Sequence, residues 1–171
     1  MPRSSHHYTV IAPISHNLAM RYWLMKSEPD CYSIDDLKRD GQNMWEGCRN
    51  YTVRNFMRDA MKPGDLAFFY HSNADPAGIV GTMEIVREGY PDPTQFDANS
   101  EYYDAKSPAE NPRWLAVDVK FQSKFARVLS LADLRDVAGL EEMLVLRRGQ
   151  RLSVMPVTEA EWEIVMRLAR G

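Results

Sequence analysis

The segment "WEGCRNYTVRNF", residues 45–56, gathers aromatic, guanidinium and amide side chains around one glycine. Aromatic rings stack on flat ligands, guanidinium and carboxamide groups hydrogen-bond to the edges of such ligands, and arginine also binds phosphate. This combination suits a site for a flat ligand such as a base, with Trp45, Arg49, Asn50 and Tyr51 as its first candidates. A structural interpretation stands beside it, because a buried tryptophan followed by residues that cap a helix has the same pattern.

Further polar candidates lie where short apolar runs end. The runs "YWLMK" (22–26) and "LAFFYHS" (66–72) predict strands, and polar groups at strand ends or in loops can point into a cleft. The candidates of this kind are Lys26, Ser27, Tyr70, His71 and Ser72. An unpaired base needs a flat apolar slot and polar groups for its Watson–Crick edge, so we expect Tyr51 or Tyr70 to complete the slot with Trp45. His71 fits a hydrogen-bonded structural role as well.

A basic run near the C-terminus could bind the phosphates that flank such a base. In "RRGQR" (147–151), Arg147, Arg148 and Arg151 are the candidate phosphate ligands. A solvated surface is the alternative for a charge run of this length.

The residues of most catalytic centres are missing from the sequence. His71 is the one histidine beyond the first twenty residues, and Cys31 and Cys48 are too far apart for a zinc or redox motif. We therefore predict no metal, no cofactor and no enzymatic activity. Two alternatives stay open. Glu28, beside Lys26 and Ser27, could serve a nucleic-acid-processing enzyme as a pocket carboxylate, and a protein-interaction scaffold would instead expose an apolar patch.

Composition limits the class of protein. The chain has 171 residues, 44% of them hydrophobic, and no apolar run approaches the roughly 18 residues of a membrane span. We predict an N-terminal tail over 1–19 without a signal peptide, followed by one domain over 20–171. On this basis we expect a cytoplasmic monomer that binds no membrane. The net charge of −3 argues against a non-specific nucleic-acid coat.

Charge is segregated along the chain. Residues 87–111 hold six acidic and two basic side chains, whereas residues 113–127 hold four basic and one acidic. The first stretch also contains most of a proline-rich segment over 91–112, which predicts a long irregular loop. Because its acidic charge repels a phosphate backbone, we expect this loop to lie away from the nucleic acid.

Strand and helix patterns alternate without a βαβ rhythm. Capping motifs predict short helices after Ser33 and Ser130 and a final helix after Thr158, and an apolar stripe predicts another over 52–61. Further strands are expected over 78–88 and 114–125 and shortly before Pro156. This mixture predicts an α+β fold with a mainly antiparallel, barrel-like sheet.

Several long segments occur in an order that resembles one known family. They are "YWLMKSEPDCYSIDDL", "MWEGCRNYTVRNFMRDAMKPGDLAFFYHSN", "GIVGTMEIVREGYPDPTQFD", "NPRWLAVDVKF" and "RRGQRLSVMPV". From Met20 nearly to the C-terminus the chain resembles the EVE domain family, although Cys48 stands where Val or a similar residue is expected. The resemblance implies a PUA-like β-barrel flanked by short helices and related to YTH domains. It also implies a pocket for a base of nucleic acid, DNA or RNA, often a modified base, and no enzymatic activity.

Overall fold

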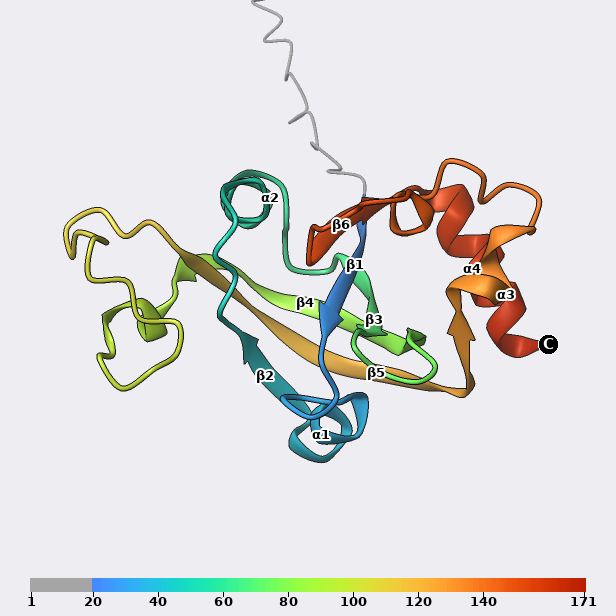
Figure 1. Cartoon of the computed structure of the whole chain (residues 1–171), viewed down its shortest axis with the longest axis horizontal. Coiled ribbons are helices and arrows are strands. Elements are labelled where there is room, and N and C mark those ends of the chain that lie inside the picture. The colour runs from blue at the N-terminus through green and yellow to red at the C-terminus, as the bar shows by residue number, and fades with distance from the viewer. Residues whose placement is uncertain (1–19) are drawn as a thin grey trace, which may run out of the picture.

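The computed structural model describes residues 20–171, and the predicted tail over 1–19 lies outside the described residues. Six strands, four α-helices and two 3₁₀ helices follow one another along this part of the chain (Figure 1). In chain order they are β1 (Tyr22–Ser27), α1 (Ile34–Asp40), β2 (Gln42–Trp45), α2 (Tyr51–Asp59), β3 (Leu66–His71), β4 (Gly78–Pro91), η1 (Pro93–Phe96), β5 (Leu115–Ser130), α3 (Leu131–Arg135), η2 (Leu144–Leu146), β6 (Val154–Val157) and α4 (Glu159–Arg170).

The strands form one mixed sheet in the order β2-β5-β4-β3-β1-β6. β1 and β3 run parallel, and the other neighbours are antiparallel. The α+β prediction is confirmed, but the closed barrel is wrong, because β2 and β6 remain as the two edges of an open sheet. Each edge strand has only four residues, and Pro156 in β6 lacks the N–H that a further strand needs.

The long hairpin of β4 and β5 lies at the centre of the structure, and the other elements are arranged around it. Figure 1 shows the loop between these strands at one end of the hairpin and α3 and α4 at the other, with α1 and α2 on opposite sides. Side chains alternate between the two faces of the sheet, so neighbouring residues enter different cores. In β3, Phe69 belongs to one buried cluster with Trp23 and Trp45, while Phe68 belongs to another with Trp162.

The helix caps explain why the helices begin where the sequence predicts. Ser33, Ser130 and Thr158 each start a helix with a reciprocal capping box, in which a side chain of the third helical residue returns a hydrogen bond. Asn50 starts α2, its side-chain oxygen accepting hydrogen bonds from the backbone N–H groups of Thr52 and Val53 at 2.8 and 3.2 Å. Within residues 20–171, each helix is too short or too polar to cross a membrane.

Candidate nucleic-acid interface

A cavity of about 650 Å³ opens beside the ends of β1 and β2. It is bounded by the segment that leads into α2, by the tip of the β4–β5 loop and by the segment before β6. Half of the twelve residues that the sequence predicts for the site line this cavity. These are Lys26, Ser27, Trp45, Arg49, Ser72 and Arg151.

Three of the remaining candidates have structural roles. Asn50 caps α2 through its side chain. Tyr70 is 4% exposed and packs in the second core cluster, on the face of the sheet opposite Trp45. The Nε2 atom of His71 accepts a hydrogen bond from the backbone N–H of Ile34 at 3.1 Å, and burial lowers the pKa of this imidazole, which favours the neutral ring that can accept it.

The other three candidates lie on the surface outside the cavity. Tyr51 is exposed and packs against Trp114, with a ring centroid distance of 4.9 Å. Arg147 forms an exposed ion pair with Glu142, and Arg148 is exposed nearby. Of the predicted basic strip, only Arg151 reaches the cavity.

Arg49 is held so completely that it has no donor left for a ligand. Its Nε–H and one Nη2–H donate to the carbonyl oxygen of Tyr102, and its other N–H groups donate to Cys48 O, Asp92 Oδ2 and Thr94 Oγ1. A guanidinium group has five N–H donors, and all five are used here. Arg49 therefore shapes the cavity wall rather than reading a base.

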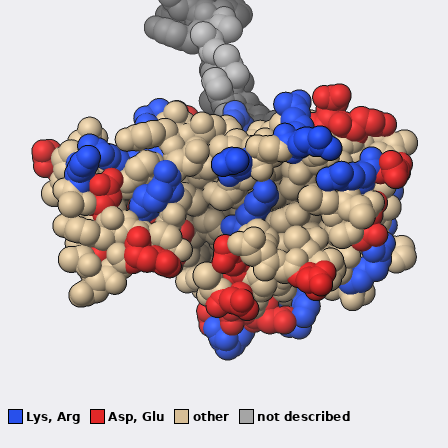
Figure 2. Space-filling view, in the orientation of Figure 1, with Lys and Arg blue, Asp and Glu red and all other residues tan. Residues whose placement is uncertain are grey.

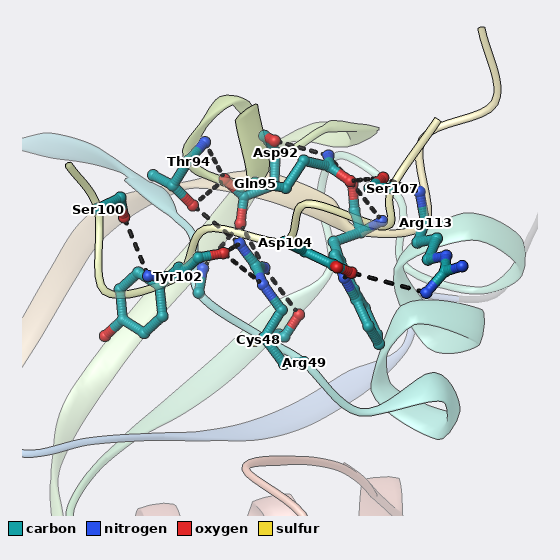
Figure 3. A network of polar contacts seen from close by, with 12 residues as sticks. Cys48, Arg49, Asp92, Thr94, Gln95, Ser100, Tyr102, Asp104, Ser107 and Arg113 are labelled. Atoms are coloured by element: carbon teal, nitrogen blue, oxygen red, sulfur yellow. Dashed lines mark hydrogen bonds and ion pairs between the residues drawn. The ribbon is translucent and has the colours of Figure 1, made fainter. Parts of the chain in front are cut away.

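The acidic loop, which the sequence predicts to lie away from the nucleic acid, forms part of the wall of the cavity. Glu101 and Tyr102 line the cavity, and Figure 3 shows Arg49 reaching into this loop toward Asp92, Thr94 and Tyr102. The side chain of Asp92 is completely buried and pairs with Arg49 at 2.9 Å. It also accepts a hydrogen bond from the backbone N–H of Gly47 at 2.9 Å. The acidic composition of the loop predicts repulsion of phosphate, but the charge of Asp92 is paired with that of Arg49 inside the protein.

The loop has an internal order that its proline content does not reveal. Gln95, in η1, is fully buried and donates to the carbonyl oxygens of Asp92 and Trp114. Its own side-chain oxygen accepts hydrogen bonds from Ser107 Oγ and from the backbone N–H of Trp114. These contacts fix the path of the chain on both sides of Tyr102.

Gly47 allows the close contact between the two walls of the cavity. Its φ angle is +85°, and a Cβ atom there would lie 2.7 Å from the ring of Tyr102. We expect Gly47→Ala to cost roughly 1–2 kcal/mol for the left-handed backbone, with an additional loss because the tyrosine must move. Binding of a ligand in the cavity should weaken with it. Urea unfolding and ligand titration of the same preparation measure the two effects.

Gly41 supplies the matched control for this substitution. Its φ angle is +77°, but a Cβ atom there would meet nothing within 4 Å. Gly41→Ala should therefore show the backbone cost alone and leave the cavity intact. Equal losses of stability and equal binding in the two variants would contradict the role given to the Gly47–Tyr102 contact.

Trp45 has both a core contact and a cavity surface. It is 8% exposed, and its ring meets Phe69 edge-on with a centroid distance of 5.4 Å and an interplanar angle of 79°. The sequence leaves a stacking surface and a core residue as alternatives for Trp45. In the structure Trp45 belongs to the buried cluster with Phe69 and also lines the cavity.

Burial changes the pKa values of several side chains that line the cavity. Burial lowers the pKa of Lys26 and raises the pKa of Glu46, and it also raises the pKa of Cys48 to about 11. Cys48 is therefore a neutral thiol and packs as a small apolar residue, as expected. In the part of the chain that the structure describes, no group of three or more His, Cys, Asp and Glu side chains could hold a metal ion.

Charge on the surface around these elements is not uniform. Figure 2 shows Lys and Arg side chains spread over the upper and middle parts of one face, with Asp and Glu side chains among them toward both sides and gathered at the lower centre. The basic side chains of this face are therefore interspersed with acidic ones.

Comparison with known proteins decides the family. The model of the EVE domain matches residues 21–168, which is nearly the whole of the described chain. The chain belongs to the EVE domain family. Human thymocyte nuclear protein 1 is 44% identical over 165 residues, which is 86% of this chain and 73% of that protein. Its name contradicts the predicted cytoplasmic location, since the human, chicken and rat relatives are all named as nuclear proteins.

Two solved structures show how closely the fold is shared. The crystal structure of human THYN1 in complex with DNA containing 5-methylcytosine is 43% identical, has a TM-score of 0.83, and the match covers 89% of this chain and 99% of that one. The YTH domain of Mmi1 is only 12% identical with a TM-score of 0.50, and the match covers 88% of this chain and 78% of that one. The second match supports the predicted relation to YTH domains at the level of the fold.

Proposed function

We propose that this EVE domain is a non-enzymatic module that binds nucleic acid and accepts one modified base, 5-methylcytosine, in the cavity beside β1 and β2. The observation that carries this proposal is the human THYN1 complex, because a chain 43% identical to this one was crystallised with DNA containing that base. A homologue of this identity and a TM-score of 0.83 supports a shared ligand class.

The cavity has the composition that a base requires. Its volume of about 650 Å³ lies within the range of roughly 300–1,000 Å³ found for small-molecule pockets. Trp45, Met44 and Leu152 offer apolar surface for the ring, and Lys26 and Arg151 offer positive charge for the ring edge and the flanking phosphates. Ser27 contributes less to recognition, because its hydroxyl already donates to the carbonyl oxygen of Tyr32 at 2.7 Å.

Binding without conversion is the simpler account of this site. Glu28, the carboxylate considered for an enzyme, is exposed, and its Oε1 atom accepts a hydrogen bond from Asn73 at 2.6 Å. It thus lacks the burial on which the enzymatic alternative depends. The name of thymocyte nuclear protein 1 also describes no reaction.

A binding screen tests the proposal directly. Labelled single- and double-stranded oligonucleotides with one 5-methylcytosine, one unmodified cytosine or another modified base are titrated with the protein, and fluorescence anisotropy gives the dissociation constants. We expect the tightest binding for 5-methylcytosine in DNA, with intact bases and strands recovered by mass spectrometry. Equal binding of all oligonucleotides, or turnover of any of them, would contradict the proposal.

The same screen, repeated at several salt concentrations, tests whether Arg147, Arg148 and Arg151 contact phosphate. Arg151→Ala should weaken every oligonucleotide similarly and reduce the slope of log K against log salt by about 1, as the loss of one phosphate contact does. Replacing Arg147, Arg148 and Arg151 together should reduce the slope further if the whole run contacts phosphate. Arg135, exposed on α3 and outside the cavity, is the control, and Arg135→Ala should leave the slope unchanged. An unchanged slope in the triple variant would remove the run from the interface.

A further inference from the structure

We infer that Glu46 is the residue by which the cavity distinguishes a cytosine ring from a thymine ring. This inference rests on the proposed function, and it adds a specificity residue that the sequence pattern alone did not indicate. The two bases are close in shape, since 5-methylcytosine and thymine carry the same methyl group. They differ at position 4 of the ring and in whether N3 carries a proton.

Three carboxylates line the cavity, and Glu46 is the one in a position to read a base. Glu28 and Glu101 are exposed, and Glu28 is also bound by Asn73. Glu46 is half-buried and stands between Trp45 and Gly47, the two residues that form the stacking surface and the contact with the loop. Its backbone position at the end of β2 is therefore fixed on both sides.

The carboxylate of Glu46 lacks a protein cation. No Lys or Arg of residues 20–171 forms an ion pair with it. Arg49, its neighbour three positions on, is fully occupied by the acidic loop. Burial raises the pKa of Glu46, which means that the protein solvates its charged form poorly. A ligand that donates a hydrogen bond to this carboxylate compensates that cost.

The exocyclic amino group of cytosine is such a donor. Glutamate and aspartate recognise cytosine by accepting a hydrogen bond from N4. Thymine instead presents the O4 carbonyl oxygen at this position, so two acceptors would face each other and neither would be satisfied. The 5-methyl group cannot separate the two bases because both carry it, whereas a carboxylate at N4 can.

The remaining polar groups of the cavity suit the rest of the cytosine edge. Cytosine has acceptors at N3 and O2, and the donors that line the cavity include the ammonium group of Lys26 and the amide of Asn43. Met44 and Leu152 provide apolar surface for the methyl group. The half-buried carboxylate of Glu46 and the donors of Lys26 and Asn43 thus complement the edge of cytosine and not that of thymine.

The test compares three bases in otherwise identical duplexes. The variable position holds 5-methylcytosine, thymine or 5-methyl-2-pyrimidinone, which keeps N3 and O2 but lacks the amino group. An abasic site lies opposite in every duplex, so that no base pair has to be broken and the cost of extruding the base is the same. We expect the wild-type protein to bind 5-methylcytosine about 10-fold more tightly than either of the other two bases.

Glu46→Gln is the decisive variant, and Glu28→Gln is its matched control in the same cavity. A glutamine amide can accept from N4 or donate to O4, so the preference for 5-methylcytosine over thymine should fall to within about 2-fold. Glu28→Gln should keep the wild-type preference. If Glu46→Gln does not fold, as judged by circular dichroism, the pyrimidinone duplex with wild-type protein and the shorter Glu46→Asp variant give the same comparison.

The outcomes separate this inference from the proposed function. A wild-type protein that binds none of the duplexes contradicts the proposed function itself. A protein that binds 5-methylcytosine and thymine equally, or that keeps its preference in Glu46→Gln, overturns the role of Glu46 and leaves base binding in place. Equal binding of 5-methylcytosine and the pyrimidinone also overturns it.

Discussion

Replacing Asp92 by alanine should destabilise the protein by roughly 3–5 kcal/mol, the range found when one partner of a buried ion pair is removed. The side chain of Asp92 is fully buried, and the partner Arg49 is only 22% exposed, so the guanidinium would keep its charge without compensation. The backbone N–H of Gly47 and both donors of Thr94 would lose their acceptor as well. Unfolding in urea, followed by tryptophan fluorescence, measures the loss.

The pH dependence of this loss has a defined sign. Burial alone would raise the pKa of Asp92, but the hydrogen bonds from Gly47, Thr94 and Arg49 outweigh it and hold the pKa below its ordinary value. A carboxyl group with a lowered pKa in the folded state stabilises the protein above its unfolded pKa of about 4, and this contribution disappears as the pH falls through the folded pKa. The difference in stability between wild type and Asp92→Asn should therefore shrink below about pH 4.

Asp65 provides the control that separates stability from binding. It is 4% exposed and accepts hydrogen bonds from Trp23 Nε1 and from the backbone N–H groups of Arg21 and Lys62, at 3.0 to 3.1 Å. It does not line the cavity beside β1 and β2. Asp65→Ala should also destabilise the protein, yet bind oligonucleotides normally where both variants are folded, while Asp92→Ala binds weakly. Equal binding by the two folded variants would show that the Asp92 network does not position the cavity wall.

Local signals in the sequence account for most of the fold. Capping residues such as Ser33 and Thr158 act within one helical turn, and alternation along 114–125 follows from the two faces of a strand, so both can be read without knowing the tertiary structure. Closure of the sheet into a barrel cannot be predicted in this way, because it depends on whether the distant strands β2 and β6 pair. Neither strand carries a local signal for that pairing, and the sheet is open where a barrel was predicted.

The candidate site shows the same division. Trp45, Lys26 and Arg151 could be chosen by residue type and position, and all three line the cavity. Tyr102 could not, because its place in the cavity wall comes from long-range contacts with Arg49 and Gly47. Glu46 could not, because its residue type alone does not show that it lines the cavity without an ion-pair partner among residues 20–171. The Arg49–Asp92 pair joins residues 43 positions apart, and its effect is to turn an acidic loop into part of the cavity. One signal could have revealed this pair. Gly47 and Arg49 lie close together in the sequence, and the acidic loop between β4 and β5 offers carboxylates for the arginine.

Replacing Trp45 by alanine should have the largest effect of any single change in the cavity, because it acts on the core and on the ligand together. The residue is 8% exposed and packs on Phe69, so Trp45→Ala should lower the free energy of unfolding by roughly 3–5 kcal/mol, as large-to-small changes in a core do. If the indole also stacks on the base, the folded fraction should bind 5-methylcytosine DNA more weakly by roughly 1–3 kcal/mol.

A conservative pair of variants separates these two contributions of Trp45. Trp23 is a second buried tryptophan of the same core cluster, and it does not line the cavity beside β1 and β2. Trp23→Phe should reduce stability at least as much as Trp45→Phe, since it also loses the hydrogen bond from Nε1 to Asp65 at 3.0 Å, yet it should leave binding unchanged. Trp45→Phe should keep most of the stability and still weaken binding, because a smaller ring covers less of the base. Denaturation curves and anisotropy titrations on the same samples provide both readouts. If Trp45→Phe binds as tightly as Trp23→Phe, the indole of Trp45 serves the core alone, and the stacking surface must be sought elsewhere in the cavity.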